Sequence, residues 1–254
     1  MRALIVGAAT GIGAAVVEKW KAKDFEVVAL DIANPANVDQ WLPVDLSEPS
    51  SIDEAVGQLG GTFDCLVSNA GLPPRDGLEE KILAVNFMGL VRCTTALLPR
   101  LNKGAAIVNT ASRAGMAWRE NIDQVKALMQ VSNHDALRDF IAKEGIDPVR
   151  AYNLSKEALI VWSMAQTERL LELDLRMNTV SPAAVSTGIL NDFASAFGDR
   201  MVKNVERVGR PGTADEIADV IVFLSSSESR WLKGVDITID GGMTAVVQTE
   251  NLGL

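Results

Sequence analysis

A glycine-rich turn between a short apolar run and a helical pattern is the feature that most constrains the fold. Residues 3–6 form an apolar run of the kind that a parallel strand buries on both faces. The turn that follows reads Gly7-x-x-x-Gly11-x-Gly13 and opens a helical pattern. Such a turn lets backbone amides approach an anion, and the positive end of the helix favours negative charge. The segment therefore predicts a strand–turn–helix unit that can cradle phosphate groups, with Thr10 and Ile12 beside the glycines.

A second apolar run, residues 26–30, ends at Asp31. A carboxylate at the end of the second strand can accept hydrogen bonds from the hydroxyls of an adenosine ribose. It would repel an additional 2′-phosphate, and Ala8, Ala9 and Thr10 supply no compensating cation. The ordered set of strand, glycines, helix, strand and acid predicts a dinucleotide site, and it favours NAD over NADP.

Strands and helices alternate along the rest of the chain. The predicted strands are residues 42–46, 63–67, 105–110, 175–181 and 235–239, and the predicted helices include residues 49–59, 78–101 and 213–226. Ser47 is a candidate N-cap of the first of these helices, and Thr213 with Glu216 forms a candidate capping box. The connection after Asp31 is too short for the usual crossover helix. This alternation predicts an α/β fold, a single Rossmann-type domain over residues 1–254 with a doubly wound parallel sheet.

Polar and glycine residues follow several of these strands, at the sheet edge where ligands bind in such folds. They are Asp45 and Leu46, Asn69-Ala70-Gly71, Ser112, and the segment from Pro182 through Val185 to Thr187. Asp45 is placed to meet an adenine edge. We therefore expect these residues to converge with the glycine turn.

Residues 115–149 interrupt the alternation and are predicted to form a helical insert. The apolar residues that follow an amphipathic helical pattern there are Val125, Leu128, Met129, Ala136, Leu137, Phe140 and Ile141. His134 is interpreted as a solvated helix residue in preference to a catalytic one. Further on, residues 183–208 are predicted to form a substrate loop.

Composition excludes several classes of function. The formal net charge of −9 argues against nucleic acid or an anionic membrane as a partner, because their phosphates would be repelled. The single histidine excludes a multi-histidine metal site, and no apolar run approaches the ~18 residues of a membrane span. Cys65 and Cys93 lie in apolar surroundings, which indicates buried thiols in a reducing compartment. We expect a cytoplasmic protein without a metal.

Tyr152 is the only tyrosine in the chain, and Lys156 follows it at i+4. On a helix this spacing places both side chains on one face. A cation held there stabilises the phenolate, so Tyr152 would exchange a proton near neutral pH rather than near its unperturbed ~10. An ordinary surface pair has the same spacing, so the pair alone leaves both interpretations open.

Taken in order, these motifs resemble the short-chain dehydrogenase/reductase family over essentially the whole chain. The set comprises Gly7-x-x-x-Gly11-x-Gly13, Asn69-Ala-Gly71, Asn86, Ser112, Tyr152-x-x-x-Lys156 and the segment from Pro182 to Thr187. The insert, the missing crossover helix and residues 156–163 look like one branch of that family. This branch contains bacterial coniferyl-alcohol dehydrogenase and 3α-hydroxysteroid dehydrogenase/carbonyl reductase.

The resemblance implies a role for each matching residue. Tyr152 would be the general acid/base, and Ser112 would hydrogen-bond the same substrate oxygen. Lys156 would hold the nicotinamide ribose hydroxyls and lower the pKa of Tyr152. Asn86 would anchor a water in the proton relay.

On the same resemblance, Val185 and Thr187 would meet the nicotinamide carboxamide. Three positions depart from the family pattern: Val6 where Thr is frequent, Ser68 where the first Asn of an Asn-Asn-Ala-Gly run is usual, and Ala183 where glycine commonly follows Pro182. The separation of Ser112 from Tyr152 is also much longer than usual, because of the insert.

The leading hypothesis is NAD-dependent interconversion of a bulky apolar alcohol and its carbonyl, with coniferyl or a similar allylic aromatic alcohol as the candidate. An apolar lid of Met116, Trp118, Ile189, Leu190, Phe193 and Phe197 motivates it, although core packing explains each of these residues equally well. Arg75, Arg113 and Arg119 are candidates to meet a polar substituent, although solvated arginines are commoner.

The alternatives use the same residues differently. One is a hydroxysteroid dehydrogenase or alicyclic ketone reductase, and a more distant one is a non-catalytic NAD-binding sensor or scaffold. An enoyl-carrier reductase is disfavoured because its Tyr–Lys spacing is usually longer. Members of the family commonly form dimers or tetramers, so the resemblance implies a homodimer or homotetramer. The insert can cover the usual interface.

Overall fold

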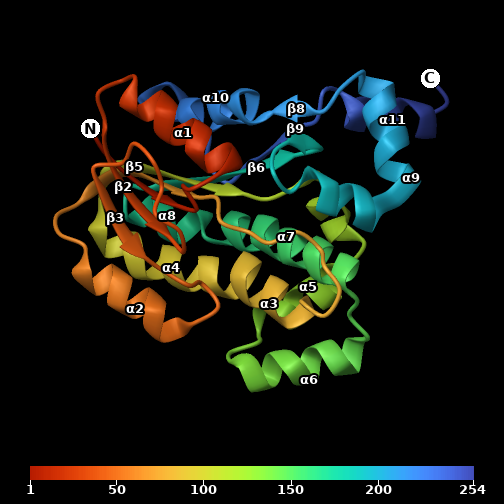
Figure 1. The fold of residues 1–254 in the computed structure, drawn as a ribbon, viewed down its shortest axis with the longest axis horizontal. Helices are drawn as coiled ribbons and strands as arrows, with labels where there is room; N and C mark the ends of the chain where they lie inside the picture. The colour runs from red at the N-terminus through yellow and green to blue at the C-terminus, as the bar shows by residue number, and fades with distance from the viewer.

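A central sheet of parallel strands carries the fold (Figure 1). The computed structural model describes residues 1–254 apart from the side chain of Arg200. Within that part of the chain, seven strands lie in the order β3-β2-β1-β4-β5-β6-β9. They are β1 (Arg2–Val6), β2 (Glu26–Asp31), β3 (Gln40–Pro43), β4 (Phe63–Ser68), β5 (Leu101–Thr110), β6 (Arg176–Pro182) and β9 (Asp236–Ile239), and a separate parallel pair joins β7 (Val185–Ser186) to β8 (Gly212–Thr213). The predicted α/β sheet is confirmed.

Apolar side chains alternate between the two faces of this sheet. In β1, Leu4 and Val6 join the core on one face, whereas Ala3 and Ile5 join the core on the other. All four are essentially inaccessible to solvent. Because a central parallel strand is buried on both faces, its sequence reads as a continuous apolar run.

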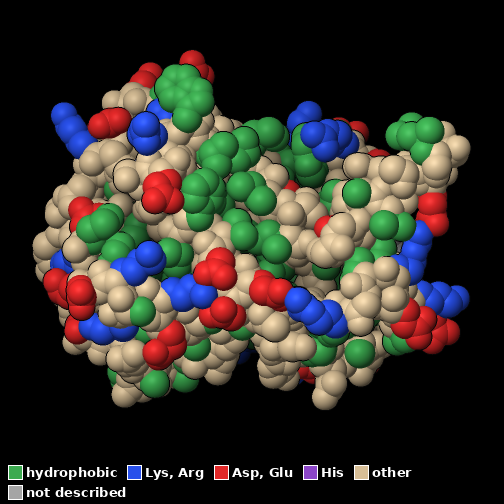
Figure 2. All heavy atoms as spheres, turned by 90° about the horizontal axis from the view of Figure 1, so that it is seen from above, with side chains coloured by type: hydrophobic (Ala, Val, Ile, Leu, Met, Phe, Trp, Pro, Cys, Tyr) green, Lys and Arg blue, Asp and Glu red, His purple; other side chains and the backbone are tan. Residues whose placement is uncertain are grey.

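Helices cover both faces of the sheet (Figure 1). On one face, α1 (Gly11–Lys21) packs against α10 (Ala214–Ser225), and Trp20 of α1 is fully buried there. On the other face lie α2 (Pro49–Gln58), α4 (Leu90–Leu97), α7 (Pro148–Ala165) and α8 (Thr167–Glu172). The predicted capping box of α10 is present: the Thr213 hydroxyl accepts from the Glu216 amide, and the Glu216 carboxylate accepts from the Thr213 amide. Figure 2 shows the face above α1 and α10, where hydrophobic side chains gather near the middle and charged side chains of both signs surround them.

The connection between β2 and β3 is short, as predicted, and the described residues between Asp31 and Gln40 form no helix. The indole of Trp41 donates a hydrogen bond to the Asp31 carbonyl oxygen at 3.0 Å and closes this connection. The prediction that Ser47 caps α2 is wrong. Glu48 occupies the N-cap position without a side-chain bond, and the Ser47 hydroxyl donates instead to Asp45 Oδ1 at 2.6 Å.

A composite helix runs from Glu79 to Arg100. It consists of α3 (Glu79–Leu83), a π-helical turn (Ala84–Gly89), α4 and a 3-10 turn (Leu98–Arg100). Among the described residues, this is the one helix that is long enough and apolar enough to cross a membrane, judged by length and composition alone. Of its most apolar 18-residue window, 67% is buried inside the protein. Its sequence is not an unbroken apolar run, because polar residues such as Asn86 and Thr94 interrupt the pattern. Those two side chains are themselves buried, which is the pattern of a core helix.

The predicted insert is helical and folds onto the outside of this layer (Figure 1). It comprises a 3-10 segment (Arg113–Arg119), α5 (Ile122–Met129) and α6 (His134–Glu144), with α5 packed on α7 and α6 packed on α3. His134 is half-buried and lies away from the strand ends that form the candidate site. Its Nδ1 lies 3.2 Å from Glu80 Oε1, and its Nε2 lies 2.9 Å from the Ser47 carbonyl oxygen. It therefore links the insert to the body of the protein and is not a fully solvated residue.

Two elements differ from the sequence-based expectation. Residues 190–208 form α9 (Leu190–Val208), so most of the expected substrate loop is a helix, broken at Gly198 where φ is 54°. A further helix, α11 (Met243–Asn251), follows the last strand and was not predicted. Figure 1 shows α9 and α11 together at one end of the molecule, close to the C-terminus.

Candidate active site

A cavity of about 1380 Å³ lies at the carboxyl ends of the central strands. Most residues predicted to form the site line it: Gly7, Thr10, Gly11, Ile12, Asp31, Asp45, Leu46, Asn69, Ala70, Gly71, Ser112, Tyr152, Lys156, Pro182, Val185 and Thr187. Gly13 and Asn86 lie behind this lining. The cavity therefore joins the glycine turn to the Tyr–Lys pair, which are far apart in the sequence.

The glycine turn has a backbone that other residues would not adopt easily. Gly7 has φ of 88°, and Gly11 has φ of 57°. A Cβ at Gly13 would lie 1.9 Å from the Gly7 carbonyl oxygen, and Asn69 Nδ2 donates to that same oxygen at 3.0 Å. The turn thus packs tightly on α1, leaving its outer side open to the cavity at the helix N-terminus.

Two carboxylates mark the end of the cavity beyond this turn. Asp31 Oδ2 accepts from the Ala9 amide at 2.8 Å, and its Oδ1 accepts from the Ala33 amide at 3.0 Å. Asp45 Oδ1 accepts from the amide and hydroxyl of Ser47. Both acids are held by neighbouring groups, and each oxygen retains lone-pair capacity for a ligand hydroxyl or amine.

Two residues that line the cavity also carry a buried polar atom that is available to pair with a ligand. Asn69 Oδ1 and Thr110 Oγ1 are buried and have no hydrogen-bond partner among the described residues. Unpaired buried polar groups are uncommon, and a bound molecule is one of the ordinary ways to pair them. Together with the open glycine turn and Asp31, they make the residues present fit a dinucleotide.

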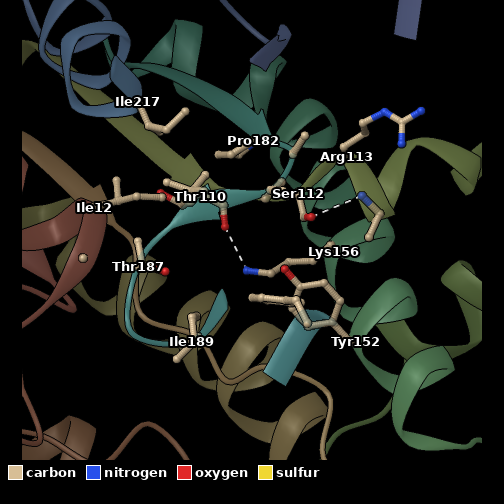
Figure 3. Close-up of a pocket in the computed structure, with 18 of the residues that line it drawn as sticks. Ile12, Thr110, Ser112, Arg113, Tyr152, Lys156, Pro182, Thr187, Ile189 and Ile217 are labelled. Atoms are coloured by element: carbon tan, nitrogen blue, oxygen red, sulfur yellow. Dashed lines mark hydrogen bonds between the residues drawn. The ribbon is translucent and has the colours of Figure 1, made fainter. Parts of the chain in front are cut away.

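Ser112, Tyr152 and Lys156 meet at the middle of the cavity (Figure 3). Ser112 follows β5 and caps the 3-10 segment, its Oγ accepting from the Ala114 amide at 3.2 Å. Tyr152 and Lys156 lie one turn apart on α7 and are both buried. Lys156 Nζ donates to the Thr110 carbonyl oxygen at 3.0 Å and lies 5.9 Å from the Tyr152 ring centroid. The three side chains point into one space, so the pair is not a surface pair.

The expected lowering of the Tyr152 pKa is wrong for this geometry. Burial raises the pKa of Tyr152 to about 12, and the hydrogen bond from the Ser112 hydroxyl only partly opposes that rise. Burial also lowers the pKa of Lys156 to about 8. The sequence showed the lysine beside the tyrosine, but it did not show that both groups lose their contact with water.

Replacing Lys156 with methionine is expected to stabilise the protein at neutral pH while disrupting its activity. A buried lysine whose pKa falls to about 8 destabilises the folded state whenever it is charged. Removing that cost, less the lost bond to Thr110, is worth roughly 1–3 kcal/mol in the free energy of unfolding.

The pH dependence of this effect has a defined sign. Between the folded pKa of about 8 and the unfolded value of 10.5, the unfolded chain binds more protons than the folded one. The stability of the parent protein therefore rises with pH in that window, and the advantage of Lys156→Met fades there. Chemical denaturation at pH 7 and pH 10 measures this, and an equal difference at both values contradicts it.

Asn86 lies on the π-helical turn and is completely buried. Its Oδ1 accepts from the Leu72 amide at 2.7 Å, and its Nδ2 donates to the Leu72 carbonyl oxygen at 2.9 Å. A Cβ added at Gly71 would lie 3.4 Å from both Asn86 Oδ1 and Lys156 Nζ, so both groups lie close to that glycine. Asn86 thus holds the loop after β4 beside Lys156. Single π-turns often occur at functional sites.

Aromatic rings from α9 cover the tyrosine. The Phe193 ring lies edge-on to the Tyr152 ring with centroids 5.1 Å apart, and the Phe197 ring lies 6.4 Å from it. Met116 and Ile189 also line the cavity. These four predicted lid residues therefore border the site.

Other predicted contacts lie outside the cavity wall. Trp118 and Leu190 are absent from the lining, and the Arg119 guanidinium stacks on the Trp118 ring at 4.1 Å. Arg75 forms an ion pair with Asp192 of α9. Arg113 does line the cavity, where its Nε donates to the Thr244 hydroxyl at 3.2 Å and lies 3.4 Å from Asp240 Oδ2.

The sequence analysis missed two parts of the wall. One part comes from α11, including Thr244 and Val247, and no recognisable helix signal follows the last strand. The other comes from the polar residues Asn121, Arg150, Asn153 and Glu157. In the sequence, three of these residues could have been found by their spacing, because positions 150, 153 and 157 fall on one face of the helix that carries Tyr152.

The described residues form neither a cluster of metal ligands nor a reactive thiol. The described residues include no group of three His, Cys, Asp or Glu side chains placed to hold a metal. Cys65 and Cys93 are buried and unpaired, and burial raises the pKa of each thiol to about 12. Both are inert packing residues in this environment.

Comparisons with known proteins agree with this geometry. Residues 1–122 match the family model described as short chain dehydrogenase, and residues 136–244 match one described as Enoyl-(Acyl carrier protein) reductase. Over 245 residues the chain is 34% identical to a coniferyl-alcohol dehydrogenase of a Pseudomonas species, covering 95% of this chain and 96% of that protein. It is 29% identical to a 3-alpha-hydroxysteroid dehydrogenase/carbonyl reductase of Comamonas testosteroni, covering 96% of this chain and 97% of that protein.

A solved structure shares the fold closely. The 3-alpha-hydroxysteroid dehydrogenase of Pseudomonas sp. B-0831, complexed with NADH, superposes with a TM-score of 0.86 at 26% identity. The match covers 98% of this chain and 99% of that one. The helical insert and the α9–α11 end of the molecule therefore lie within the matched length.

Proposed function

This chain belongs to the short-chain dehydrogenase/reductase family and is an oxidoreductase, and from that premise we propose that it is an NAD-dependent dehydrogenase of bulky apolar alcohols. The reaction interconverts the alcohol and its carbonyl. Coniferyl alcohol or a similar allylic aromatic alcohol is the leading substrate. The observation that carries the proposal is the convergence of Ser112, Tyr152 and Lys156 under the phenylalanine rings of α9.

Each of these side chains has a task that its position supports. The Tyr152 hydroxyl gives a proton to the substrate oxygen or takes one from it. The Ser112 hydroxyl hydrogen-bonds that same oxygen and stabilises its developing charge. The Lys156 ammonium binds ribose hydroxyls and favours the phenolate of Tyr152. A bound nicotinamide supplies the hydride chemistry, which no side chain provides.

Because Tyr152 is buried, the proposed mechanism needs the positive charge of Lys156. With the Tyr152 pKa raised to about 12, proton transfer at neutral pH needs a nearby positive charge. The Lys156 pKa of about 8 leaves the ammonium protonated at pH 7, although only by a small margin. We expect activity on the alcohol to depend on pH through this coupled pair.

The end of the cavity that carries Asp31 favours NAD over NADP. Asp31 is fixed by two backbone amides at the end of β2, where its charge opposes a 2′-phosphate. Asp45 lies beyond it for the adenine, and Gly7, Thr10, Gly11 and Ile12 surround the pyrophosphate position. Thr187 lies next to Gly11, and together with Pro182 and Val185 it would hold the carboxamide.

Asn86 and Gly13 act from behind the wall. Asn86 has both amide ends bonded to the Leu72 backbone, so its proposed role is to position the loop beside Lys156. The relay water proposed for it would need to bind at a remaining lone pair. Gly13 allows α1 to approach Gly7, which keeps the turn open.

A hydroxysteroid dehydrogenase is the second candidate, and a specific observation favours it. The NADH-bound structure with a TM-score of 0.86 is a 3-alpha-hydroxysteroid dehydrogenase, and the apolar rings of α9 suit a steroid as well as an aromatic ring. The catalytic residues are the same for both substrates. The two substrates differ in the body that the apolar side chains of α9 and α11 would contact.

One assay decides between these substrates and tests the cofactor. The purified protein is given coniferyl alcohol, cinnamyl-type alcohols and 3α-hydroxysteroids, each with NAD and with NADP, and the reduced nicotinamide is followed by absorbance. We expect turnover of an aromatic alcohol and a higher kcat/KM with NAD. Turnover of steroids alone favours the second candidate, and binding of NAD without any turnover favours a sensor or scaffold.

We also propose a cytoplasmic homo-oligomer that binds no nucleic acid and no membrane. The insert covers part of α7 and α3, so subunits cannot associate through the parts of those helices that α5 and α6 cover. Light scattering of the protein with and without residues 120–145 tests whether the insert limits assembly. If a folded deletion variant has the same number of subunits as the natural protein, the insert does not limit assembly.

A further inference from the structure

Four polar side chains form one side of the cavity next to the catalytic pair. They are Asn121, Arg150, Asn153 and Glu157, and we call them the polar wall. Arg150, Asn153 and Glu157 lie on one face of α7, directly beside the face that carries Tyr152 and Lys156. Any alcohol held at Tyr152 is therefore bordered by this wall.

Three members of the polar wall already satisfy one another. The Glu157 side chain is 1% exposed and receives two hydrogen bonds from the Arg150 guanidinium, at 2.9 and 2.6 Å. Asn121 Nδ2 donates to the same carboxylate at 2.9 Å. Arg150 Nε donates to Gln124 Oε1 at 2.7 Å, which ties the pair to α5. This paired network holds the wall in one arrangement and leaves it little capacity to bind a new group.

Asn153 is the exception in the polar wall. Its Oδ1 is buried and has no hydrogen-bond partner among the described residues. An amide left unpaired in a protein interior is unfavourable, and a site that holds such a group discriminates strongly in favour of a ligand that pairs with it. The two ends of an Asn amide are interchangeable by rotation, and a hydroxyl can pair with either end because it both donates and accepts.

Another part of the cavity lining is apolar. Phe193 and Phe197 from α9 and Met243 and Val247 from α11 line it. A substrate that fits both sides has an apolar body and a polar group in addition to its reacting alcohol. A purely apolar alcohol fills the cavity but leaves Asn153 unpaired.

Resting on the proposed function, we propose that Asn153 is a specificity-determining residue that selects substrates bearing a second hydroxyl away from the reacting carbon. Within the bulky apolar alcohols, the preferred substrates are then amphipathic diols and hydroxylated aromatic alcohols.

The test compares matched substrates that differ by one hydroxyl. They are 3-phenylprop-2-en-1-ol and its 2-, 3- and 4-hydroxyphenyl derivatives, together with a 3α-hydroxysteroid with and without a second hydroxyl. Each is assayed with NAD, and the readout is the ratio of kcat/KM for the hydroxylated substrate to that for its parent. In the natural protein we expect a ratio of about ten for at least one pair, the size of one net hydrogen bond.

Variants assign this ratio to Asn153. Asn153→Leu keeps the approximate volume and removes the amide, so the ratio is expected to fall to about one. Asn153→Asp keeps an acceptor for the hydroxyl and is expected to preserve the preference. The matched control is Asn102→Leu, at the far end of β5 from Ser112, which should leave the ratio at its natural value. A thermal unfolding curve for each variant shows that it is folded.

The outcomes separate this inference from the proposed function. Because a general loss of packing lowers every rate together, it leaves the ratio unchanged. Turnover with the same ratio in the natural protein and in Asn153→Leu overturns the role of Asn153 and leaves the proposed function standing. No turnover of any alcohol or steroid overturns the proposed function and this inference with it.

Discussion

Replacing Tyr152 with phenylalanine is expected to lower kcat by about 10²–10⁴-fold, the usual contribution of a general acid/base. The change removes one oxygen from a ring that is already buried beneath Phe193, so packing is preserved. In the proposed site NAD would bind mainly to the glycine turn, Asp31 and Lys156, and we therefore expect its affinity to be nearly unchanged. Stopped-flow turnover measures the first quantity, and titration calorimetry measures the second.

A second hydroxyl deletion on the same helix is the control for this variant. Ser163 lies further along α7, where its Oγ accepts from Asn109 Nδ2 at 2.8 Å. Ser163→Ala is expected to lose some stability but to retain turnover. If Tyr152→Phe turns over the substrate at the natural rate, the proposed proton transfer through Tyr152 is wrong. A parallel loss of NAD affinity would instead assign the residue a structural role.

Replacing Gly13 with alanine is expected to weaken NAD binding by about 100-fold, because small misplacements of binding groups have effects of that size. The new Cβ would lie 1.9 Å from the Gly7 carbonyl oxygen and 2.9 Å from Asn69 Nδ2. Since a backbone atom is the obstacle, the turn must move and the amides that face the cavity move with it. Overpacking of this kind also costs typically 1–3 kcal/mol of stability. Calorimetric NAD titration and thermal unfolding measure the two effects.

Gly57 is the matched control for Gly13. It lies within α2, and a Cβ added there meets no atom within 4 Å. Gly57→Ala is expected to leave NAD affinity intact and to raise stability slightly, since alanine is the better helix former. Native NAD affinity in Gly13→Ala would mean that the glycine turn does not hold the cofactor.

The elements that the sequence predicted well are those specified by local pattern. The strands around Val6 and Val67 are apolar because both faces of the sheet are buried, and that signal is visible without any tertiary information. The glycine turn and the capping box at Thr213 are also local, because each depends on residues a few positions apart. The order of these motifs was enough to identify the family, and most of the site residues predicted from it line the cavity.

The parts that sequence reasoning missed depend on tertiary contacts. α9 contains Gly198 within an otherwise helical segment, so its pattern resembles that of a loop. The network of Arg150 with Glu157 becomes apparent only when α5 packs beside α7 and supplies Asn121. The pKa of Tyr152 could not be read from the Lys156 spacing, because burial of both groups outweighs their proximity.

The arrangement of α9 also has a consequence for how such an enzyme diversifies. The strand ends and the glycine turn form the half of the cavity proposed to hold the cofactor, whereas one contiguous segment, Leu190–Val208, supplies much of the apolar cover. That segment begins after Ile189 and is followed by Gly209, whose φ is 88°. Exchanging this stretch alters which molecules enter without rebuilding the residues that move the proton. A lineage that inherits this layout can acquire new substrates through changes in a single short stretch of its gene.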